Sequence, residues 1–510
     1  MRRALLLALA FSAITLVEFE FFPGHTYLQG KTQLYVPMLE RLDTPGFLSR
    51  DLVAIHPNLS YTIYDEVSLF LHEALRLDFK TALALQQILC RVAAVAGVYL
   101  LVCSAGFGEV WALLIAALVN LGAFLPGAAL HLVDPEPIPA NFAFALSLLA
   151  IGCLACSKPL LSGLAGGIAF LYDPSIAAVM WIAVLIAFMA DRQLRRLIRP
   201  SLTIFAVFIL LLANLAQLQP GISDSEPPFS RIPADIAAIL QTRTARVWVP
   251  HWAGREIWVY LAILVCSLWA SARIWPRLNR QTRWFFLLPS LLGVLSIPIS
   301  AVLLEQFGWW LLPRIQPTRA LLFTVEFSLI ACSIAGIQAL RLRNRAEATA
   351  WFLFLVTVVV ITRTAAPPSL PIHHRESITD LARWAETSTW GSSMFAFPDA
   401  GRDLYPGVFR AESRRALWVD WESGAQSCYS GSLARTWNDR WRRDMEGHSA
   451  FFSVRRFQAA WPIDYYVLKA SNRLARIAPV FANADFVVYD SHALTSSASP
   501  PHRVVADAAR

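Results

Sequence analysis

Carboxylates near the end of the first apolar run are the first residues that could do chemistry. Glu18 and Glu20 lie in the run at 4–22, and Asp51 follows a turn-rich stretch at 42–47. A carboxylate at a membrane boundary can accept the proton of an attacking hydroxyl. Two residues along a helix turn about 200°, so Glu18 and Glu20 cannot both face one cavity. All three are predicted catalytic candidates, and the alternative is an ordinary interfacial acid.

Three further residues, Arg91, Gln316 and Arg319, are predicted to bind the substrate through an anionic group such as phosphate. Arg91 and Glu326 lie inside apolar runs at similar depths, roughly 12–15 Å below the outer boundary at 1.5 Å per residue. They form either a buried ion pair that locks two helices or a phosphate site. Gln316 and Arg319 stand at the outer boundary of another run, where an arginine suits a lipid phosphate or reaches to lipid headgroups.

Acids from two loops could meet and hold a divalent cation. They and the neighbouring histidines are Asp43, Asp51, His56, Asp65 and Glu66 in the first long loop, and His131, Asp134 and Glu136 after the third run. Their spacing matches no metal-binding signature, so no residue is assigned as a metal ligand and the cofactor is left unknown.

Composition predicts a membrane protein. The chain of 510 residues is 56% apolar and only 16% charged, whereas soluble chains are about 45–50% apolar and a quarter charged. The net charge of +8 does not indicate nucleic-acid binding, because the arginines cluster in short loops between apolar runs. Membrane lipids are the expected surroundings, and no nucleic-acid partner is expected.

The apolar runs predict a polytopic α-helical membrane protein with about eleven transmembrane helices. The runs lie at 4–22, 81–103, 110–130, 140–156, 160–171, 175–190, 201–218, 257–272, 284–304, 320–340 and 350–362. The break at Tyr172-Asp173-Pro174 fits either two spans or a re-entrant pair. Arginine-rich loops follow the sixth, eighth and tenth runs, which predicts a cytoplasmic N-terminus and an extracytoplasmic tail.

Three domains are predicted. Residues 1–364 form the transmembrane domain, with a long external loop at 23–80 that carries a surface helix at 65–77, and 365–375 form a linker. Residues 376–510 form a small extracytoplasmic α/β domain. Its predicted helices span 376–386 and 433–445, and its predicted strands span 394–397, 416–421, 464–468, 478–481 and 486–489, with a hairpin turn at 483–485.

The order of these features resembles the GT-C class of membrane glycosyltransferases. More closely, the chain resembles bacterial GT-C-like membrane proteins related in plan to the O-mannosyl and aminoarabinose transferases. The matching stretches are 27–37 with Asp51 after it, 166–174, 316–319, and in the tail 414–421 with Trp437 and Arg440. They cover nearly the whole chain but are diffuse motifs.

The resemblance implies a polyprenyl-phosphate sugar donor, an external active site under the first loop and a carboxylate base there. The function expected is transfer of a sugar from that lipid-linked donor to an envelope glycan, lipid or protein at the outer face of a bacterial inner membrane. Lys31 and Thr32 stand where an active relative is expected to carry an acid. The alternative is therefore a non-catalytic transporter or assembly partner in envelope polysaccharide export. A transporter is expected to show internal repeats, and none is evident.

Overall fold

The structure, a computed structural model, describes residues 2–57, 62–218, 226–365, 372–445, 463–475 and 477–492. The chain forms two compact units. The helical unit comprises Met1–Tyr27, Asn58–Pro368 and Cys428–Ser430, and the sheet unit comprises Leu28–Pro57, Ser369–Ser427 and Gly431–Arg510. The predicted domain boundaries assigned 28–57 to the membrane part, whereas here this segment groups with the tail. Most of the predicted linker, 366–371, lies outside the described residues.

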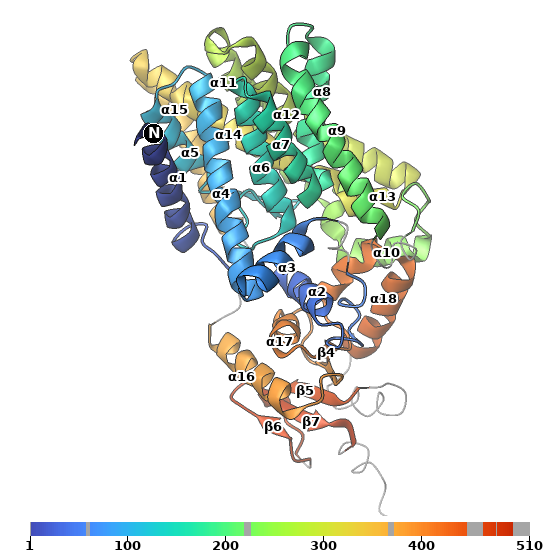
Figure 1. The fold of residues 1–510 in the computed structure, drawn as a ribbon. Coiled ribbons are helices and arrows are strands. Elements are labelled where there is room, and N and C mark those ends of the chain that lie inside the picture. Colours follow the sequence, from blue (N-terminus) through green and yellow to red (C-terminus); the bar gives the residue numbers. More distant parts are fainter. Residues whose placement is uncertain are drawn as a thin grey trace, which may run out of the picture. The chain divides into compact units, whose positions relative to one another are not determined.

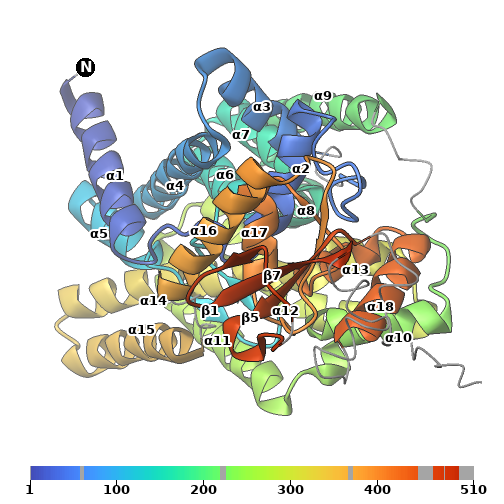
Figure 2. The same ribbon diagram turned by 90° about the horizontal axis from the view of Figure 1, so that it is seen from below.

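The helical unit is a bundle in which α1, α4, α6 and α7 run side by side (Figure 1), seen from one end in Figure 2. Its α-helices are α1 (Arg2–Glu20), α3 (Tyr64–Leu75), α4 (Phe79–Ser104), α5 (Glu109–Val119), α6 (Pro139–Ala155), α7 (Pro159–Tyr172), α8 (Pro174–Ala190), α9 (Arg195–Leu218), α10 (Ala234–Arg243), α11 (Gly254–Ile274), α12 (Arg280–Val302), α13 (Leu311–Ile315), α14 (Leu321–Arg341) and α15 (Arg345–Ala365). A short hairpin, β1 (Phe124–Leu125) and β2 (Leu130–His131), follows α5.

Among the described residues, five helical segments are long and apolar enough to cross a bilayer. They are Phe79–Ser104, Arg195–Leu215, Gly254–Arg277, Arg280–Phe307 and Leu311–Arg341. The last is buried along almost all of its length and forms the centre of the bundle, whereas α9 is mostly exposed. Large apolar side chains such as Leu210, Trp258 and Phe352 point outward, as they do on surfaces that face lipid. The chain is therefore a multi-pass membrane protein.

Each of the eleven predicted runs contains a helix, but the number that crosses the membrane remains a prediction. One predicted span, at 110–130, is not helical along its whole length. The run at 110–130 is helical only to Val119, and a helix of 11 residues is too short for a hydrocarbon core of about 30 Å. The Asn120 amide donates to Ala116 O at 2.8 Å, and Gly122 has φ +79°, so the chain turns there into the β1–β2 hairpin. Apolar content alone did not reveal this turn.

The arginine-rich loops lie together at one end of the helical unit. Arg280 pairs with Asp191, Arg273 lies 2.9 Å from Glu347, and Arg3 pairs with Glu109. The first two contacts join the loops after α8, α11 and α14 to one another, and the third joins the start of α1 to the loop after α4. Asn279 Nδ2 donates to Ser104 O at 3.4 Å, which connects the loop after α11 to the end of α4. The arginine-rich loops therefore lie at the same end of the helical unit, as expected from the sequence.

Helices α4 and α6 touch backbone to backbone where two glycines meet. A Cβ on Gly152 would lie 2.4 Å from Gly97 O, and a Cβ on Gly97 would lie 2.5 Å from Leu148 C. Real Cβ atoms do not approach that closely, so only glycine permits this helix crossing. The crossing fixes α4, which carries Arg91, against α6.

Gly152→Ala is expected to destabilise the protein by about 1–3 kcal/mol, because the added methyl group forces the two backbones apart. The measurement is the thermal unfolding midpoint of the full-length protein in detergent. Gly254→Ala is the matched control, since a Cβ there meets nothing within 4 Å. Equal midpoints for the two variants would contradict the close crossing.

The sheet unit is a small α/β fold, as predicted. Its strands are β3 (Met394–Ala396), β4 (Ala416–Leu417), β5 (Tyr465–Lys469), β6 (Phe481–Ala482) and β7 (Phe486–Asp490), in the order β4-β3-β5-β7-β6. β3 pairs parallel with β4 and β5, and β7 pairs antiparallel with β5 and β6. The predicted turn joins β6 and β7, where Asn483 Oδ1 accepts from the backbone of Asp485 and Phe486 at 3.1 and 2.9 Å.

Helices α16 (Ile372–Ser388) and α18 (Gly431–Met445) correspond to predicted ones, whereas α2 (Thr32–Asp43) and α17 (Tyr405–Ser413) were not predicted. Helix α17 begins with Pro406 and Gly407, which read as a turn in sequence. Gly407 packs closely on α2, since a Cβ there would lie 2.1 Å from Gln33 Oε1 and 3.1 Å from Gln33 Cβ. The first loop is therefore built into the sheet unit through α2.

Candidate functional site

The end of the helical unit opposite the arginine-rich loops gathers polar residues from four segments. Thr26 N donates to Pro135 O at 2.9 Å, and the Tyr64 hydroxyl donates to Pro137 O at 2.7 Å. Ile63 N donates to Leu171 O at 3.1 Å. The exit of α1, the start of α3, the loop at 132–138 and the end of α7 thus meet at one rim. We call this set of segments the outer rim.

Arg91 is the central cation beneath this rim and is 5% exposed. Its Nη2 donates to Gly24 O at 2.7 Å and to Asp134 O at 3.2 Å, and its guanidinium lies 5.6 Å from the centroid of the Phe19 ring. Nε and Nη1 are buried and donate to no described residue. Arg91 therefore joins the exit of α1 to the 132–138 loop and keeps two N–H groups available to an anion.

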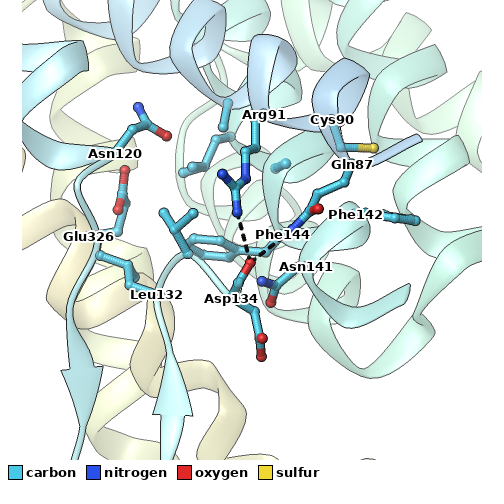
Figure 3. Close-up of a pocket in the computed structure, with 14 residues that line it drawn as sticks. Gln87, Cys90, Arg91, Asn120, Leu132, Asp134, Asn141, Phe142, Phe144 and Glu326 are labelled. Carbon is cyan, nitrogen blue, oxygen red and sulfur yellow. Dashed lines mark hydrogen bonds between the residues drawn. The ribbon is translucent and has the colours of Figure 1, made fainter. Parts of the chain in front are cut away.

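A small cavity with a mostly apolar lining lies beside Arg91 (Figure 3). Its lining includes Arg91, Gln87, Asn120 and Glu326, and its volume of about 30 Å³ has room for one or two water molecules. Arg91 and Glu326 lie at the same depth, as predicted, and both line this cavity, but no ion pair joins them among the described residues. A sugar phosphate does not fit in this arrangement.

The two acids at the end of α1 face different surroundings, as their helical spacing predicts. Glu18 is 2% exposed, and neither of its carboxylate oxygens has a hydrogen-bond partner among the described residues. Arg91 and Glu326 both lie within electrostatic range of Glu18. Glu20 is exposed at the last residue of the helix. Glu18 thus lies near both Arg91 and a second buried acid, Glu326, while Glu20 meets water.

Gln316 and Arg319 lie together at the start of the segment that leads into α14. Arg319 Nε donates to Gln316 Oε1 at 3.0 Å, and its Nη1 donates to Asp173 Oδ2 at 3.0 Å. The other oxygen of Asp173 caps α8 by accepting from Ser175 N at 2.9 Å. Two stretches that the sequence analysis singled out separately, 166–174 and 316–319, are therefore joined by a half-buried ion pair.

The start of α3 adds a pair of adjacent acids to the outer rim. Asp65 is 4% exposed. Burial, followed by the hydrogen bond and the negative charge of Glu66, raises the pKa of Asp65 to about 8. The raised pKa of Asp65 favours its protonated form, which can donate a hydrogen bond to Glu66.

Asp51 belongs to the sheet unit and is fully buried. Its Oδ1 accepts from Val53 N and Ala54 N at 3.0 Å each, and its Oδ2 accepts from Leu417 N at 3.0 Å. Arg410 Nη1 lies 3.9 Å from Oδ2. These bonds give Asp51 a structural role in joining the first loop to β4, and its predicted catalytic role remains a prediction.

Asp51 lies beside residues of the stretch 414–421, one of the stretches that carry the family resemblance. Arg410 Nη1 donates to Asp420 Oδ1 at 3.0 Å, and Trp437 Nε1 donates to Asp420 O at 3.0 Å. Arg440 Nη1 donates to Trp418 O at 2.9 Å. The motif residues of the tail therefore form a buried hydrogen-bonded cluster. Asp420 belongs to the stretch 414–421 singled out from sequence, whereas Arg410 was not predicted, because only the fold brings it to Asp51.

The sequence analysis also missed His25 and Gln87. Two adjacent glutamines, Gln86 and Gln87, inside an apolar run are a signal that could have been used, since polar side chains there need partners. Gln86 Nε2 donates to Ser68 Oγ at 3.0 Å, and its Oε1 accepts from the Tyr172 hydroxyl at 3.0 Å. Gln87 binds His25 and the 132–138 loop.

The acids do not form a metal site in the described part of the chain. No three His, Cys, Asp or Glu side chains among these residues are grouped so as to hold a metal ion. The divalent cation considered from sequence therefore does not fit the described arrangement.

No protein-family model matches the sequence, and no curated protein matches it. Among solved structures, the chain is similar to the archaeal oligosaccharyltransferase AglB from Archaeoglobus fulgidus in complex with an inhibitory peptide and a dolichol-phosphate. The identity is 12% and the TM-score 0.44, over 91% of this chain and 69% of that one. It is also similar to ArnT from Cupriavidus metallidurans bound to undecaprenyl phosphate, with 12% identity and a TM-score of 0.35 over 98% and 99%. At these scores the similarity carries no conclusion about what this chain does.

Proposed function

We propose that this chain is a membrane glycosyltransferase that moves a sugar from a polyprenyl-phosphate donor to an envelope glycan, lipid or protein. The carrying observation is Arg91, a buried arginine with two available N–H groups beside the buried acid Glu18. A guanidinium fork is suited to a phosphate group, and a carboxylate nearby is suited to an attacking hydroxyl or a developing positive charge on the sugar. The family resemblance of the sequence points to the same chemistry.

The proposed roles divide between cations and acids. Arg91, Arg319 and Gln316 bind the donor phosphate, and Glu18, Glu20 and Asp51 are the candidate acids. Arg319 already pairs with Asp173, so the phosphate would compete with that carboxylate. Asp51 would have to give up backbone hydrogen bonds to act as a base, whereas Glu20 is already exposed.

The proposed location is the inner membrane of a bacterium, with the N-terminus in the cytoplasm and the sheet unit outside. The arginine-rich loops share one end of the helical unit, which is the pattern expected of a cytoplasmic face. The outer rim then faces the outer leaflet. A reporter fused after residue 510 would be active only outside the cytoplasm.

One observation favours the alternative of a non-catalytic transporter or assembly partner. The cavity at Arg91 holds only one or two water molecules. Binding of a lipid-linked sugar at this cavity would require it to widen. The alternative predicts no sugar transfer under any condition.

The test uses purified full-length protein with a panel of polyprenyl-phosphate hexoses labelled in the sugar, and bacterial lipid extract as acceptor. Wild-type protein is expected to incorporate label. Glu20→Gln is expected to lower the rate about 100-fold at an unchanged thermal midpoint. Asp51→Asn is expected to lose rate and thermal stability together, because its amide group would face Leu417 N–H.

Glu305→Gln is the control for these substitutions, since Glu305 is another exposed acid that we assign no role. Its rate should equal that of wild type. If the protein transferred label from none of the donors, the proposal of a transferase would be refuted and the alternative of a non-catalytic protein would remain. Wild-type rates in both Glu20→Gln and Asp51→Asn would remove these two acids from the mechanism.

A further inference from the structure

His25 lies just beyond α1 at the outer rim, between the ring of Phe19 and the side chain of Gln87. Its ring stacks on Phe19, with centroids 4.5 Å apart and planes at 14°. Its Nδ1 lies 2.7 Å from Gln87 Oε1. The imidazole is half-buried and held in one orientation by these contacts.

The hydrogen bonds of Gln87 determine which ring nitrogen of His25 carries the proton. Gln87 Nε2 donates to Asp134 O at 3.2 Å and to Pro135 O at 2.9 Å. Since carbonyl oxygens only accept, the amide nitrogen must face them and Oε1 must face His25. Oε1 also only accepts, so Nδ1 is the donor. In the neutral ring, Nε2 then carries the lone pair, and no described residue donates to it.

The charged groups around His25 come from two helices. Burial lowers the pKa of His25, and Arg91 and Lys80 of α4 lower it further, while the hydrogen bond to Gln87 and the charge of Glu20 on α1 act in the opposite direction. The net effect on the pKa of His25 is downward. At neutral pH the ring is therefore uncharged, with Nε2 able to accept a proton.

We propose that His25 Nε2 is the general base that accepts the proton of the acceptor hydroxyl during sugar transfer. This rests on the proposed function. The hydroxyl oxygen bonds to C1 of the sugar as the bond from C1 to the phosphate oxygen breaks. The bonding pair leaves with the polyprenyl phosphate, and the hydroxyl proton moves to Nε2. Glu20 stabilises the imidazolium that forms, and Gln87 is a positioning residue for the ring.

The first test does not need transfer activity. Diethyl pyrocarbonate acylates neutral imidazole, and mass spectrometry reports the modification at His25 in the full-length protein as a function of pH. Modification at His25 is expected with a midpoint below 6.5, the usual pKa of histidine. Gln87→Glu places a carboxylate against Nδ1 and is expected to raise the midpoint by about 1 unit or more. Exposed His251 is the reactivity control, with the same midpoint in both proteins.

Two outcomes of this labelling would overturn the inference. In the first, His25 remains unmodified between pH 5 and 8 while His251 reacts, which would mean that Nε2 is not accessible. In the second, Gln87→Glu leaves the His25 midpoint unchanged, which would mean that Gln87 does not hold Nδ1.

The second test uses the label-transfer assay. His25→Gln is expected to lower the rate about 100-fold or more and to remove the loss of rate at acidic pH, at an unchanged thermal midpoint. Gln87→Glu is expected to move that acidic limb to higher pH. A His25→Gln variant with the wild-type rate and pH profile would overturn the role of His25 and leave the transferase standing. A wild-type protein that transfers no sugar would overturn both.

Discussion

Arg410→Met is expected to destabilise the sheet unit by about 3–5 kcal/mol, the usual loss when one partner of a buried ion pair is removed. Arg410 is 1% exposed. Its Nη1 contacts Asp420 at 3.0 Å and lies 3.9 Å from Asp51, and its Nη2 donates to Gln33 O at 3.0 Å. Methionine fills part of the space but leaves the buried carboxylate of Asp420 without its ion-pair partner.

The measurement is limited proteolysis of the full-length protein in detergent, followed as a function of temperature. Cleavage within 372–445 is expected at a much lower temperature in Arg410→Met than in wild type. Arg442→Met, at an exposed position of α18, is the control and should change stability by less than about 0.5 kcal/mol. Adding Asp420→Asn to Arg410→Met should recover part of the loss. Equal proteolysis of wild type and Arg410→Met would show that this cluster does not hold the unit together.

The general arrangement of both units could be predicted because hydrophobic patterning is local. Long apolar runs gave a helix at each predicted place, and short continuous apolar runs such as those of β5 and β7 gave the longer strands. The hairpin turn at 483–485 could be predicted for the same reason, since Asn483 stabilises it through bonds to residues only two and three positions ahead.

The parts that failed depend on contacts between distant residues. The grouping of 28–57 with the tail depends on Arg410 binding Gln33 and on Asp51 binding Leu417. These pairs are more than 360 residues apart, so no local pattern could indicate them. β4 is only two residues long, because after Leu417 the chain turns to form the cluster with Asp420 instead of continuing the ladder.

The candidate site likewise contains residues that local sequence patterns predicted and residues that only contacts between distant parts of the chain reveal. Helical spacing correctly separated Glu18 from Glu20, and depth along the helices correctly placed Arg91 and Glu326 at one level. His25 could not be recognised, because its partner Gln87 lies 62 residues away. The role of Gln87 follows in turn from Asp134, another 47 residues along. A base oriented by such a chain of contacts has no sequence motif.

Arg91→Met is expected to lower sugar transfer at least 100-fold and to lower the thermal midpoint of the helical unit. The loss has two causes. The bonds from Nη2 to Gly24 O and Asp134 O disappear, so the exit of α1 is no longer tied to the 132–138 loop. Glu18 also loses the nearby positive charge of Arg91, which destabilises this buried carboxyl group. The measurements are the label-transfer rate and the unfolding midpoint of the purified protein.

Arg91→Lys separates the two causes. Lysine keeps the positive charge, so the midpoint is expected to recover, but its single ammonium cannot reproduce the planar fork that holds two carbonyls and offers Nε and Nη1 to a phosphate. Its transfer rate should therefore stay low, with weaker binding of polyprenyl phosphate. Arg255→Met, at an exposed position of α11, is the control for loss of a cation and should behave like wild type. Full activity in Arg91→Lys would show that Arg91 acts through its charge alone, and full activity in Arg91→Met would remove the residue from the site.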